Sequence, residues 1–329
     1  MNRTMNSNLN DYENRVDLSV LLLTCNHEMY LEKSIESVLK QETRYSYELL
    51  IGVDYSVDKT LEIARKYAKL YSNITVIERN CTETLDLISK MRTLSKGQFI
   101  GILEGDDYWL STHKIDIQVR FLSENSNFIG CCHKFMIVDQ SDNEIKNYSI
   151  ARYTNKEVYT RKDMEKGKLP SQTSTLMYRN VFRSNRVLEE DYSNCNSIGD
   201  MKIAMVLSLL GNVYVMNEKL GVYRYVNLAG ESWSARTTNQ NLALKYWEWM
   251  DNRIVFAEKC FSTKLSYCGL KCSIIYYSVI YFAKKPSLAN LQIVCKLIMK
   301  DHNIFNLICV LLRLTITPFR VIGKILRRI

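Results

Sequence analysis

The chain has 329 residues, 47% of them hydrophobic, which is enough to bury the core of one large α/β domain with a smaller part, or of two domains. The formal net charge of +9 is unevenly placed. Residues 235–329 carry 15 Lys/Arg against 4 Asp/Glu, a surplus of 11, so residues 1–234 carry a net charge of −2. The difference predicts two surfaces, and the basic one suits nucleic acid or an anionic membrane.

The ten cysteines show neither a C-x-x-C pair nor a zinc-like spacing, and residues 1–15 are polar, without the apolar stretch of a signal peptide. These features argue against a zinc domain and against a secreted, disulfide-stapled domain. We therefore expect reduced, mostly buried thiols in a cytoplasmic protein.

Apolar runs alternate with helical patterns along the first hundred residues. Strands are predicted at 18–24, 48–53, 74–77 and 99–103, and helices at 30–41, around 61–71 and at 83–94. The near-continuous apolar run at 18–24 is typical of a parallel strand covered on both faces. The alternation predicts an α/β fold with a doubly wound, mostly parallel, Rossmann-like sheet, which binds ligands at the carboxyl ends of its strands.

The fourth predicted strand runs into an acidic turn, Glu104-Gly105-Asp106-Asp107. Several unpaired carboxylates are too costly to bury in a core, and Gly105 lets the backbone bend so that Glu104 and Asp106 converge on one point. Such a pair suits a hard divalent cation, because Mg²⁺ typically takes one or two carboxylates together with phosphate oxygens of a substrate. A solvated acidic turn is the alternative for so short a motif.

Polar residues also follow the first two strands, as Thr24 to Asn26 and as Asp54. The carboxyl ends of parallel strands meet at one edge of the sheet, so these residues are expected to lie near Glu104 and Asp106. Three polar clusters at one edge favour a ligand site over the alternative of a solvated turn.

Shorter patterns follow the acidic turn. A helix is predicted at 114–124, strands at 128–136, 171–179, 213–216 and 220–226, a variable excursion at 138–168, and a polar loop at 191–200. The loop ends at Asp200, in front of an apolar helix. An acid at a helix start can serve as a cap alone, worth about 1 kcal/mol.

From residue 241 on the pattern is helical and rich in aromatic residues. The apolar run 272–283 is too short to span a bilayer, which takes about 20 residues. Residues 319–329 mix apolar and basic side chains, which predicts a short basic amphipathic helix suited to an anionic membrane interface. A helical subdomain with a solvated basic face is an equal alternative. Nucleic acid is not an expected partner, because large apolar residues interrupt the charge.

Five blocks occur in order: L-S-V-L-L-L-T-C-N from residue 18, V-D-Y-S-V-D-K-T from 53, L-E-G-D-D-Y-W from 103, I-G-D from 198 and V-Y-R from 222. The order resembles family 2 glycosyltransferases of the GT-A fold, in particular bacterial enzymes that build surface polysaccharides. The resemblance implies a nucleotide-sugar glycosyltransferase domain at 1–234, followed by a basic, aromatic-rich helical region at 235–329.

The resemblance also implies where the nucleotide binds. Thr24 and Asn26 would line the nucleotide pocket, and Asp54 would accept a hydrogen bond from the base. Glu104 would lie near the ribose. The family usually has Asp where this chain has Glu104, and it often has two adjacent acids where this chain has Val53-Asp54.

The same resemblance assigns the chemistry to three acids. Asp106 would hold the Mg²⁺ or Mn²⁺ ion that bridges the diphosphate, and Asp107 would orient that site. A metal ion stabilises the charge that builds on the departing nucleoside diphosphate. Asp200 matches the catalytic base, although Glu often precedes that base where this chain has Gly199. A base that deprotonates the acceptor hydroxyl on the opposite face would give single displacement with inversion.

These assignments imply an inverting, non-processive, metal-dependent hexosyltransferase, because the Q-x-x-R-W signature of processive synthases is absent. Its donor would be a nucleoside-diphosphate sugar, with UDP favoured. Its acceptor would be a glycan or lipid-linked glycan of a surface polysaccharide, reached with peripheral contact at the inner membrane face. A non-catalytic subunit that binds a metal structurally is one alternative. A nucleotidyltransferase is a weaker one, because the loop after the first strand lacks the Gly and Lys/Arg residues it would need.

Overall fold

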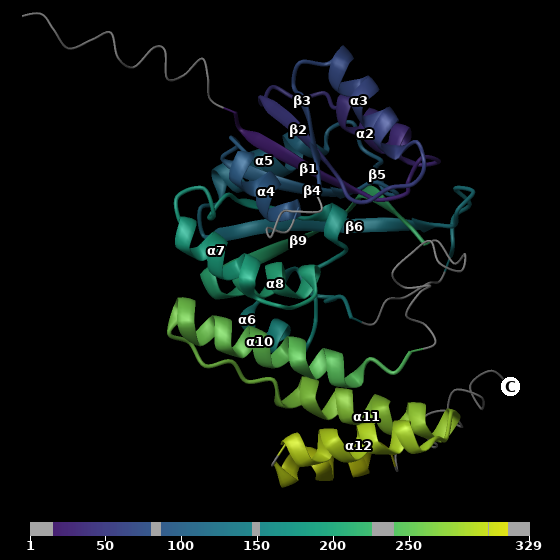
Figure 1. Cartoon of the computed structure of the whole chain (residues 1–329). Helices are drawn as coiled ribbons and strands as arrows, with labels where there is room; N and C mark the ends of the chain where they lie inside the picture. The colour runs from purple at the N-terminus through teal and green to yellow at the C-terminus, as the bar shows by residue number, and fades with distance from the viewer. Residues whose placement is uncertain (1–15, 80–86, 147–151, 226–239, 302, 315–329) are drawn as a thin grey trace, which may run out of the picture.

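The computed structural model describes residues 16–79, 87–146, 152–225, 240–301 and 303–314 (Figure 1). Within this part, a nine-stranded sheet has the order β3-β2-β1-β4-β8-β6-β9-β5, and β7 pairs with β9. Helices cover both faces of the sheet (Figure 1). The predicted fold class, a mostly parallel α/β sheet followed by helices, is confirmed.

The first half of the sheet is parallel. Its elements are β1 (Leu18–Thr24), α2 (Leu31–Leu39), β2 (Tyr47–Val53), α3 (Thr60–Leu70), β3 (Ile74–Glu78), α4 (Leu87–Leu94) and β4 (Phe99–Glu104). The register pairs Thr24 with Val53 and Leu23 with Glu104, so β1, β2 and β4 end level with one another. The polar residues that follow these strands therefore leave the sheet at the same edge.

Alternating burial explains why this half folds as a two-sided sheet. Leu18, Val20 and Leu22 belong to the hydrophobic cluster beneath α2, α3 and α5, whereas Leu21 belongs to the cluster on the other face. All four side chains are fully buried. Each buried leucine or valine contributes about 1.5–3 kcal/mol, which favours a strand covered on both faces.

The second half mixes parallel and antiparallel strands. It contains β5 (Tyr108–Trp109), α5 (Lys114–Glu124), β6 (Phe128–Val138), β7 (Val158–Tyr159), α6 (Arg161–Glu165), the short 3₁₀ helix η1 (Thr173–Thr175), β8 (Met177–Arg179), α7 (Arg186–Asn194), α8 (Gly199–Leu210) and β9 (Asn212–Arg224). β8 is antiparallel to both β4 and β6, and β9 runs parallel to β6.

Five predicted elements of this half differ from the structure. The strand at 171–179 is a 3₁₀ turn followed by the three-residue β8, and the excursion at 138–168 contains β7 and α6. The two strands predicted at 213–216 and 220–226 form one strand, β9. Its pairing with β6 is irregular opposite His133 to Phe135, and the polar residues between the two predicted strands lie in this irregular stretch. The loop at 191–200 begins inside α7, which Asn185 caps by accepting the Leu188 amide at 3.0 Å.

The remaining helices form layers below α8 (Figure 1). They are α10 (Ala243–Phe261), α11 (Cys268–Lys284) and α12 (Leu288–Asp301), and residues 304–314 are also helical. Trp247, Met250 and Phe256 of α10 belong to the same hydrophobic cluster as α8. Among the described helices, none is both long and apolar enough to cross a membrane. The boundary predicted at residue 234 and the helix predicted at 319–329 lie outside the described residues and stay predictions.

Candidate active site

Two loops at the carboxyl edge of the sheet are tied together. Asn26, which has a left-handed backbone with φ of 53°, accepts the Val57 amide on its side-chain oxygen at 2.8 Å. Its own amide donates to Ser56 Oγ at 3.1 Å. The Asp58 carboxylate accepts the Glu28 amide at 3.0 Å. Asn tolerates this backbone region better than most residues, so Asn26 fixes the loops that we expect to hold the nucleotide.

Asp54 lies at the same edge and is paired with Arg79. Its amide donates to the Thr24 carbonyl at 2.9 Å, and its carboxylate lies 3.2 Å from Arg79 Nη1. Both side chains of the pair are more than one-third exposed. Exposed pairs of this kind contribute little to stability, so Arg79 can exchange Asp54 for a ligand at low cost.

The acidic turn requires glycine at its second position. A Cβ on Gly105 would come within 2.5 Å of Thr24 Oγ1 and 2.8 Å of His27 Nδ1. Thr24 is 3% exposed, so its side chain forms the floor beneath the turn. The Gly105 amide donates to the Leu23 carbonyl at 2.8 Å and holds the turn against the end of β1.

Asp107 is the anchored acid of the turn and is only 1% exposed. One carboxylate oxygen accepts the Arg224 amide at 2.8 Å. The other accepts Gln172 Nε2 at 2.7 Å and Ser174 Oγ at 2.6 Å. Both oxygens are therefore used inside the protein. Burial and the nearby acids raise the pKa of Asp107 well above its usual range.

Glu104 is partly buried and shares one partner with Asp107. Gln172 Nε2 donates to Glu104 Oε2 at 2.9 Å. Burial first, and then the neighbouring charges of Asp106 and Asp200, raise the pKa of Glu104 to about 8. Burial is the larger cause and the two acids add to it, so a cation bound here would favour the ionised form of Glu104.

Asp106 is the acid of the turn that remains available to a ligand. Its carboxylate is 19% exposed and lies 4.0 Å from His27 Nε2. Ligand oxygens of Glu104, Asp106 and Asp107 all lie within 4.8 Å of one another. Hard carboxylate oxygens with excess negative charge fit Mg²⁺ or Mn²⁺, so the residues are suited to the predicted ion. Asp106 would be its first protein ligand, because both Asp107 oxygens are occupied by internal hydrogen bonds.

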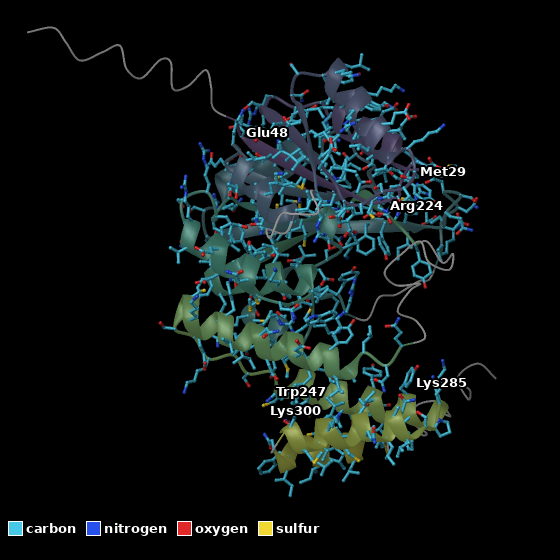
Figure 2. All side chains as sticks on the ribbon, in the orientation of Figure 1. Met29, Glu48, Arg224, Trp247, Lys285 and Lys300 are labelled. Atoms are coloured by element: carbon cyan, nitrogen blue, oxygen red, sulfur yellow. The ribbon has the colours of Figure 1, made fainter. Side chains whose placement is uncertain are left out.

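Arg224 stands at the end of β9 and contacts this turn; Figure 2 labels it close to Met29. Its buried guanidinium donates to the Asp106 carbonyl at 3.0 Å and to the Asp142 carboxylate at 2.7 Å. It also lies over the Tyr30 ring, 4.6 Å from the centroid. The side chain thereby joins the acidic turn to the residues before α2 and after β6.

Asp200 lies at the start of α8, close enough to Glu104 to raise the pKa of that acid. One oxygen accepts the Met201 amide at 2.6 Å, and the other lies 3.2 Å from Arg152 Nη1. Asp200 lines a small cavity together with Gln172, the residue that bonds Glu104 and Asp107. Asp200 is not the cap of α8, because the N-cap residue is Ile198 and no side chain makes a capping bond there. The alternative of a cap alone is therefore wrong, and the function of Asp200 as a base stays a prediction.

A second cavity of about 220 Å³ adjoins the first through the shared residues Pro170 and Ser171. Phe135 and Tyr153 line it, with ring centroids 5.6 Å apart in an edge-to-face arrangement. Tyr153 lies near enough to Glu104 and Asp200 for their charges to help raise its pKa to about 12, after the larger effect of burial. An aromatic wall beside the acidic turn suits the apolar face of a sugar.

The structure brings the predicted residues Thr24, Asn26, Asp54, Glu104, Asp106 and Asp107 to one edge and places Asp200 nearby. Their individual functions stay predictions. The sequence reasoning did not identify several supporting side chains, namely His27, Arg79, Arg152, Gln172, Ser174 and Arg224. Arg224 ends the V-Y-R block, and Gln172 and Ser174 stand in the polar stretch S-Q-T-S. These two patterns are the sequence signals that could have pointed to the supporting side chains. The contacts themselves join residues up to 118 positions apart in the chain.

A mostly parallel sheet that gathers carboxylates where its strands end is typical of enzymes that bind a metal together with a nucleotide. Residues 19–186 match the family model described as Glycosyl transferase family 2. This chain therefore belongs to glycosyl transferase family 2, and the resemblance seen in its sequence is confirmed.

Similar proteins agree with this assignment. Uncharacterized protein Rv1520 of Mycobacterium tuberculosis is 20% identical over 239 residues, which cover 70% of this chain and 64% of that protein. The Escherichia coli protein WfaP, named UDP-Glc:alpha-D-GlcNAc-diphosphoundecaprenol beta-1,3-glucosyltransferase, is 27% identical over 146 residues, 42% of this chain and 57% of WfaP. The chain thus spans less than two thirds of these relatives.

Among solved structures, S. aureus TarS 1-349 in complex with UDP-GlcNAc has a TM-score of 0.61 and 18% sequence identity. The match covers 86% of this chain and 79% of that chain. At this identity the likeness establishes a shared GT-A-like fold, in agreement with the sheet order described above.

Proposed function

We propose that this chain is an inverting, non-processive, metal-dependent glycosyltransferase. It moves a sugar from a nucleoside-diphosphate sugar to a hydroxyl group of a lipid-linked glycan in surface polysaccharide synthesis. The observation that supports it most is the link through Gln172. This side chain bonds both Glu104 and Asp107 and lines the same cavity as Asp200, so it connects the acidic turn to the wall of that cavity.

The proposed donor site uses the loops after β1 and β2. Asn26 and Asp54 hold the nucleoside, Glu104 lies near the ribose, and Asp106 would hold Mg²⁺ or Mn²⁺. When bound, the ion stabilises the negative charge that develops on the departing diphosphate. UDP is the proposed nucleotide, because WfaP is named for UDP-Glc and TarS 1-349 has also been crystallised with UDP.

The proposed acceptor site lies on the other side of the acidic turn. A sugar rests against Phe135 and Tyr153, and its hydroxyl group donates to an Asp200 oxygen. Asp200 takes that proton as the hydroxyl attacks the anomeric carbon. Arg152 lies 3.2 Å from Asp200 and would hold its carboxylate in place before the acceptor arrives. The lipid-linked class follows the name of WfaP, and it agrees with a reaction at the cytoplasmic side of a membrane.

Calorimetric titration with UDP, GDP and dTDP, with and without Mn²⁺, tests the donor site. We expect Mn²⁺-dependent binding of UDP, lost in Asp106→Ala and kept in the control Glu62→Ala, an exposed acid of α3. Binding of none of the three nucleotides under either condition would contradict the proposal and favour a non-catalytic metal-binding subunit.

The proposed base is tested separately. Asp200→Asn should lower the rate of sugar transfer by about 10²- to 10⁴-fold, because general base catalysis is typically worth that much. Its affinity for UDP should stay unchanged. Glu190→Gln, which changes an exposed acid of α7, should retain full activity. An Asp200→Asn enzyme with normal transfer would contradict the assignment of Asp200 as the base.

A further inference from the structure

The outermost helical layer exposes an apolar stripe along α12. Leu288 is 72% exposed, Leu291 42% and Met299 64%, whereas Val294 and Leu297 are buried. Positions 288, 291 and 299 fall within an arc of about 80° on a 3.6-residue helix, and 294 and 297 fall about 60° or more outside this arc. α12 therefore buries one apolar stripe and presents a second one outward.

The helical residues 304–314 repeat this arrangement. Ile304 is 68% exposed, Phe305 73% and Leu311 54%, whereas Val310 is only 2% exposed. Two successive segments thus present large apolar side chains to the outside. Large exposed apolar patches mark interaction sites. We call it the apolar face, and it consists of Leu288, Leu291, Ile298, Met299, Ile304, Phe305, Ile308 and Leu311.

The charged residues of 284–314 are mostly basic. Residues 284–314 contain the basic residues Lys284, Lys285, Lys296, Lys300 and Arg313, and Asp301 as their one acid. Asp301 is 9% exposed and accepts Asn306 Nδ2 at 3.0 Å, so it does not offset the basic surface. Lys285 and Lys300 mark this outer layer in Figure 2. The occupant of the face must therefore be both apolar and negatively charged.

We propose that the apolar face docks on an anionic lipid bilayer. Its leucine, isoleucine and phenylalanine side chains enter the boundary between headgroups and acyl chains, and the lysines pair with lipid phosphates. A second copy of this chain fits less well, because it would bring equal positive charges together. Nucleic acid also fits less well, because it offers no apolar surface to this many aliphatic side chains.

Co-sedimentation with lipid vesicles tests the proposal without any sugar donor, so its result is independent of the proposed function. The full chain is mixed with vesicles of phosphatidylcholine alone or of phosphatidylcholine with phosphatidylglycerol. We expect binding to the anionic vesicles that weakens as salt is added, and little binding to the neutral ones.

Two double variants separate the apolar and the basic contributions. Phe305→Glu with Leu311→Glu should weaken vesicle binding at least tenfold. Lys296→Gln with Lys300→Gln should weaken it by about fivefold for each lysine, and only on the anionic vesicles. The matched controls are Leu70→Glu, which changes a 67% exposed leucine of α3, and its neighbour Lys69→Gln. Both controls should bind as the parent chain does.

Several results would overturn the proposal. The first is no binding of the parent chain to anionic vesicles. The second is a vesicle binding that stays unchanged in the variant Phe305→Glu with Leu311→Glu but is abolished in the variant Arg327→Gln with Arg328→Gln. This result would assign the contact to residues 315–329. An oligomer in solution that becomes a monomer in the Phe305/Leu311 variant, without vesicle binding, would assign the face to self-association. Circular dichroism of each variant checks that its fold is intact.

Discussion

Two clusters of buried charge in this molecule differ in their balance. The first joins α4 to α7, where Arg92 donates to both oxygens of Glu189 at 2.8 Å. The Arg92 side chain is 1% exposed, and its guanidinium also lies over the rings of Phe182 and Tyr192. One positive and one negative group, both with satisfied hydrogen bonds, leave no excess charge at this place.

The second cluster is the acidic turn, which gathers Glu104, Asp106 and Asp107. The nearby Arg224 guanidinium is directed at carbonyl oxygens and at Asp142, and Arg152 is paired with Asp200. The turn therefore keeps an excess of negative charge inside the protein. A buried cluster with equal positive and negative charge stabilises the fold by itself. A buried cluster with more acids than cations is stabilised fully only when a positive ligand binds.

Removing half of the balanced pair should have the largest effect on folding. Glu189→Gln leaves the buried Arg92 without its counter-ion, which typically costs about 3–5 kcal/mol of unfolding free energy. Urea denaturation at pH 7 measures this loss. Glu78→Gln, which breaks the exposed pair with Arg65, should cost under about 1 kcal/mol. Similar losses in the two variants would show that the comparison is wrong.

The acidic turn should be more sensitive to shape than to the loss of one charge. Gly105→Ala places a methyl group 2.5 Å from Thr24 Oγ1, and overpacking of this kind typically costs about 1–3 kcal/mol. Thermal unfolding of the variant measures the loss. Gly269→Ala is the control, because a Cβ there meets nothing within 4 Å and alanine favours a helix. A Gly105→Ala protein as stable as its parent would mean that the turn can shift freely.

The unbalanced cluster should make metal-free protein less stable as pH rises. The pKa of Glu104 is about 8 in the folded chain against 4.5 without the fold, so the folded state binds this proton more tightly. Stability from this group is complete below pH 4.5 and is lost as pH approaches 8. We expect the melting temperature in EDTA to fall over this window, and to fall less in Glu104→Gln. Equal slopes for both proteins would contradict the assignment.

The smallest effect on folding is expected at Asp106. In EDTA, Asp106→Asn should change the free energy of unfolding by no more than about 0.5 kcal/mol, because the side chain is not part of the internal hydrogen-bond network. The parent chain should gain stability when Mn²⁺ and UDP are added together, and the variant should not. A variant that is stabilised equally by Mn²⁺ and UDP would place the ion elsewhere.

The parallel half of the sheet and its acidic edge could be predicted from sequence, because their signals are local. The apolar runs around Leu21 and Ile102 alternate with helical stripes, and each polar cluster follows its strand directly. The rule that ligands bind where parallel strands end then placed Asn26, Asp54 and Asp106 together without further information.

The rest of the site depends on contacts that no local pattern encodes. Gln172 and Arg224 reach the acidic turn from 65 and 117 positions away along the chain. The antiparallel β8 has only three residues, which is too short for a period to show. The Asn- and Ser-rich end of α7 was predicted as a loop because its exposed side is polar. Leu188 and Tyr192, which are buried, have the spacing of a helix. The polar composition of the segment nevertheless favoured a loop in the prediction.

The position of α10 has a consequence for how this protein can change in evolution. Trp247, Met250 and Phe256 are almost fully buried in the cluster that also contains the inner side of α8. If α10, α11 and α12 were exchanged for the helices of a relative, the residues of α8 that pack against α10 would have to change at the same time. Asp200 lies at the start of that helix, so such an exchange would also alter the support of the proposed base. Substitutions in α8 and in α10 should therefore accumulate together.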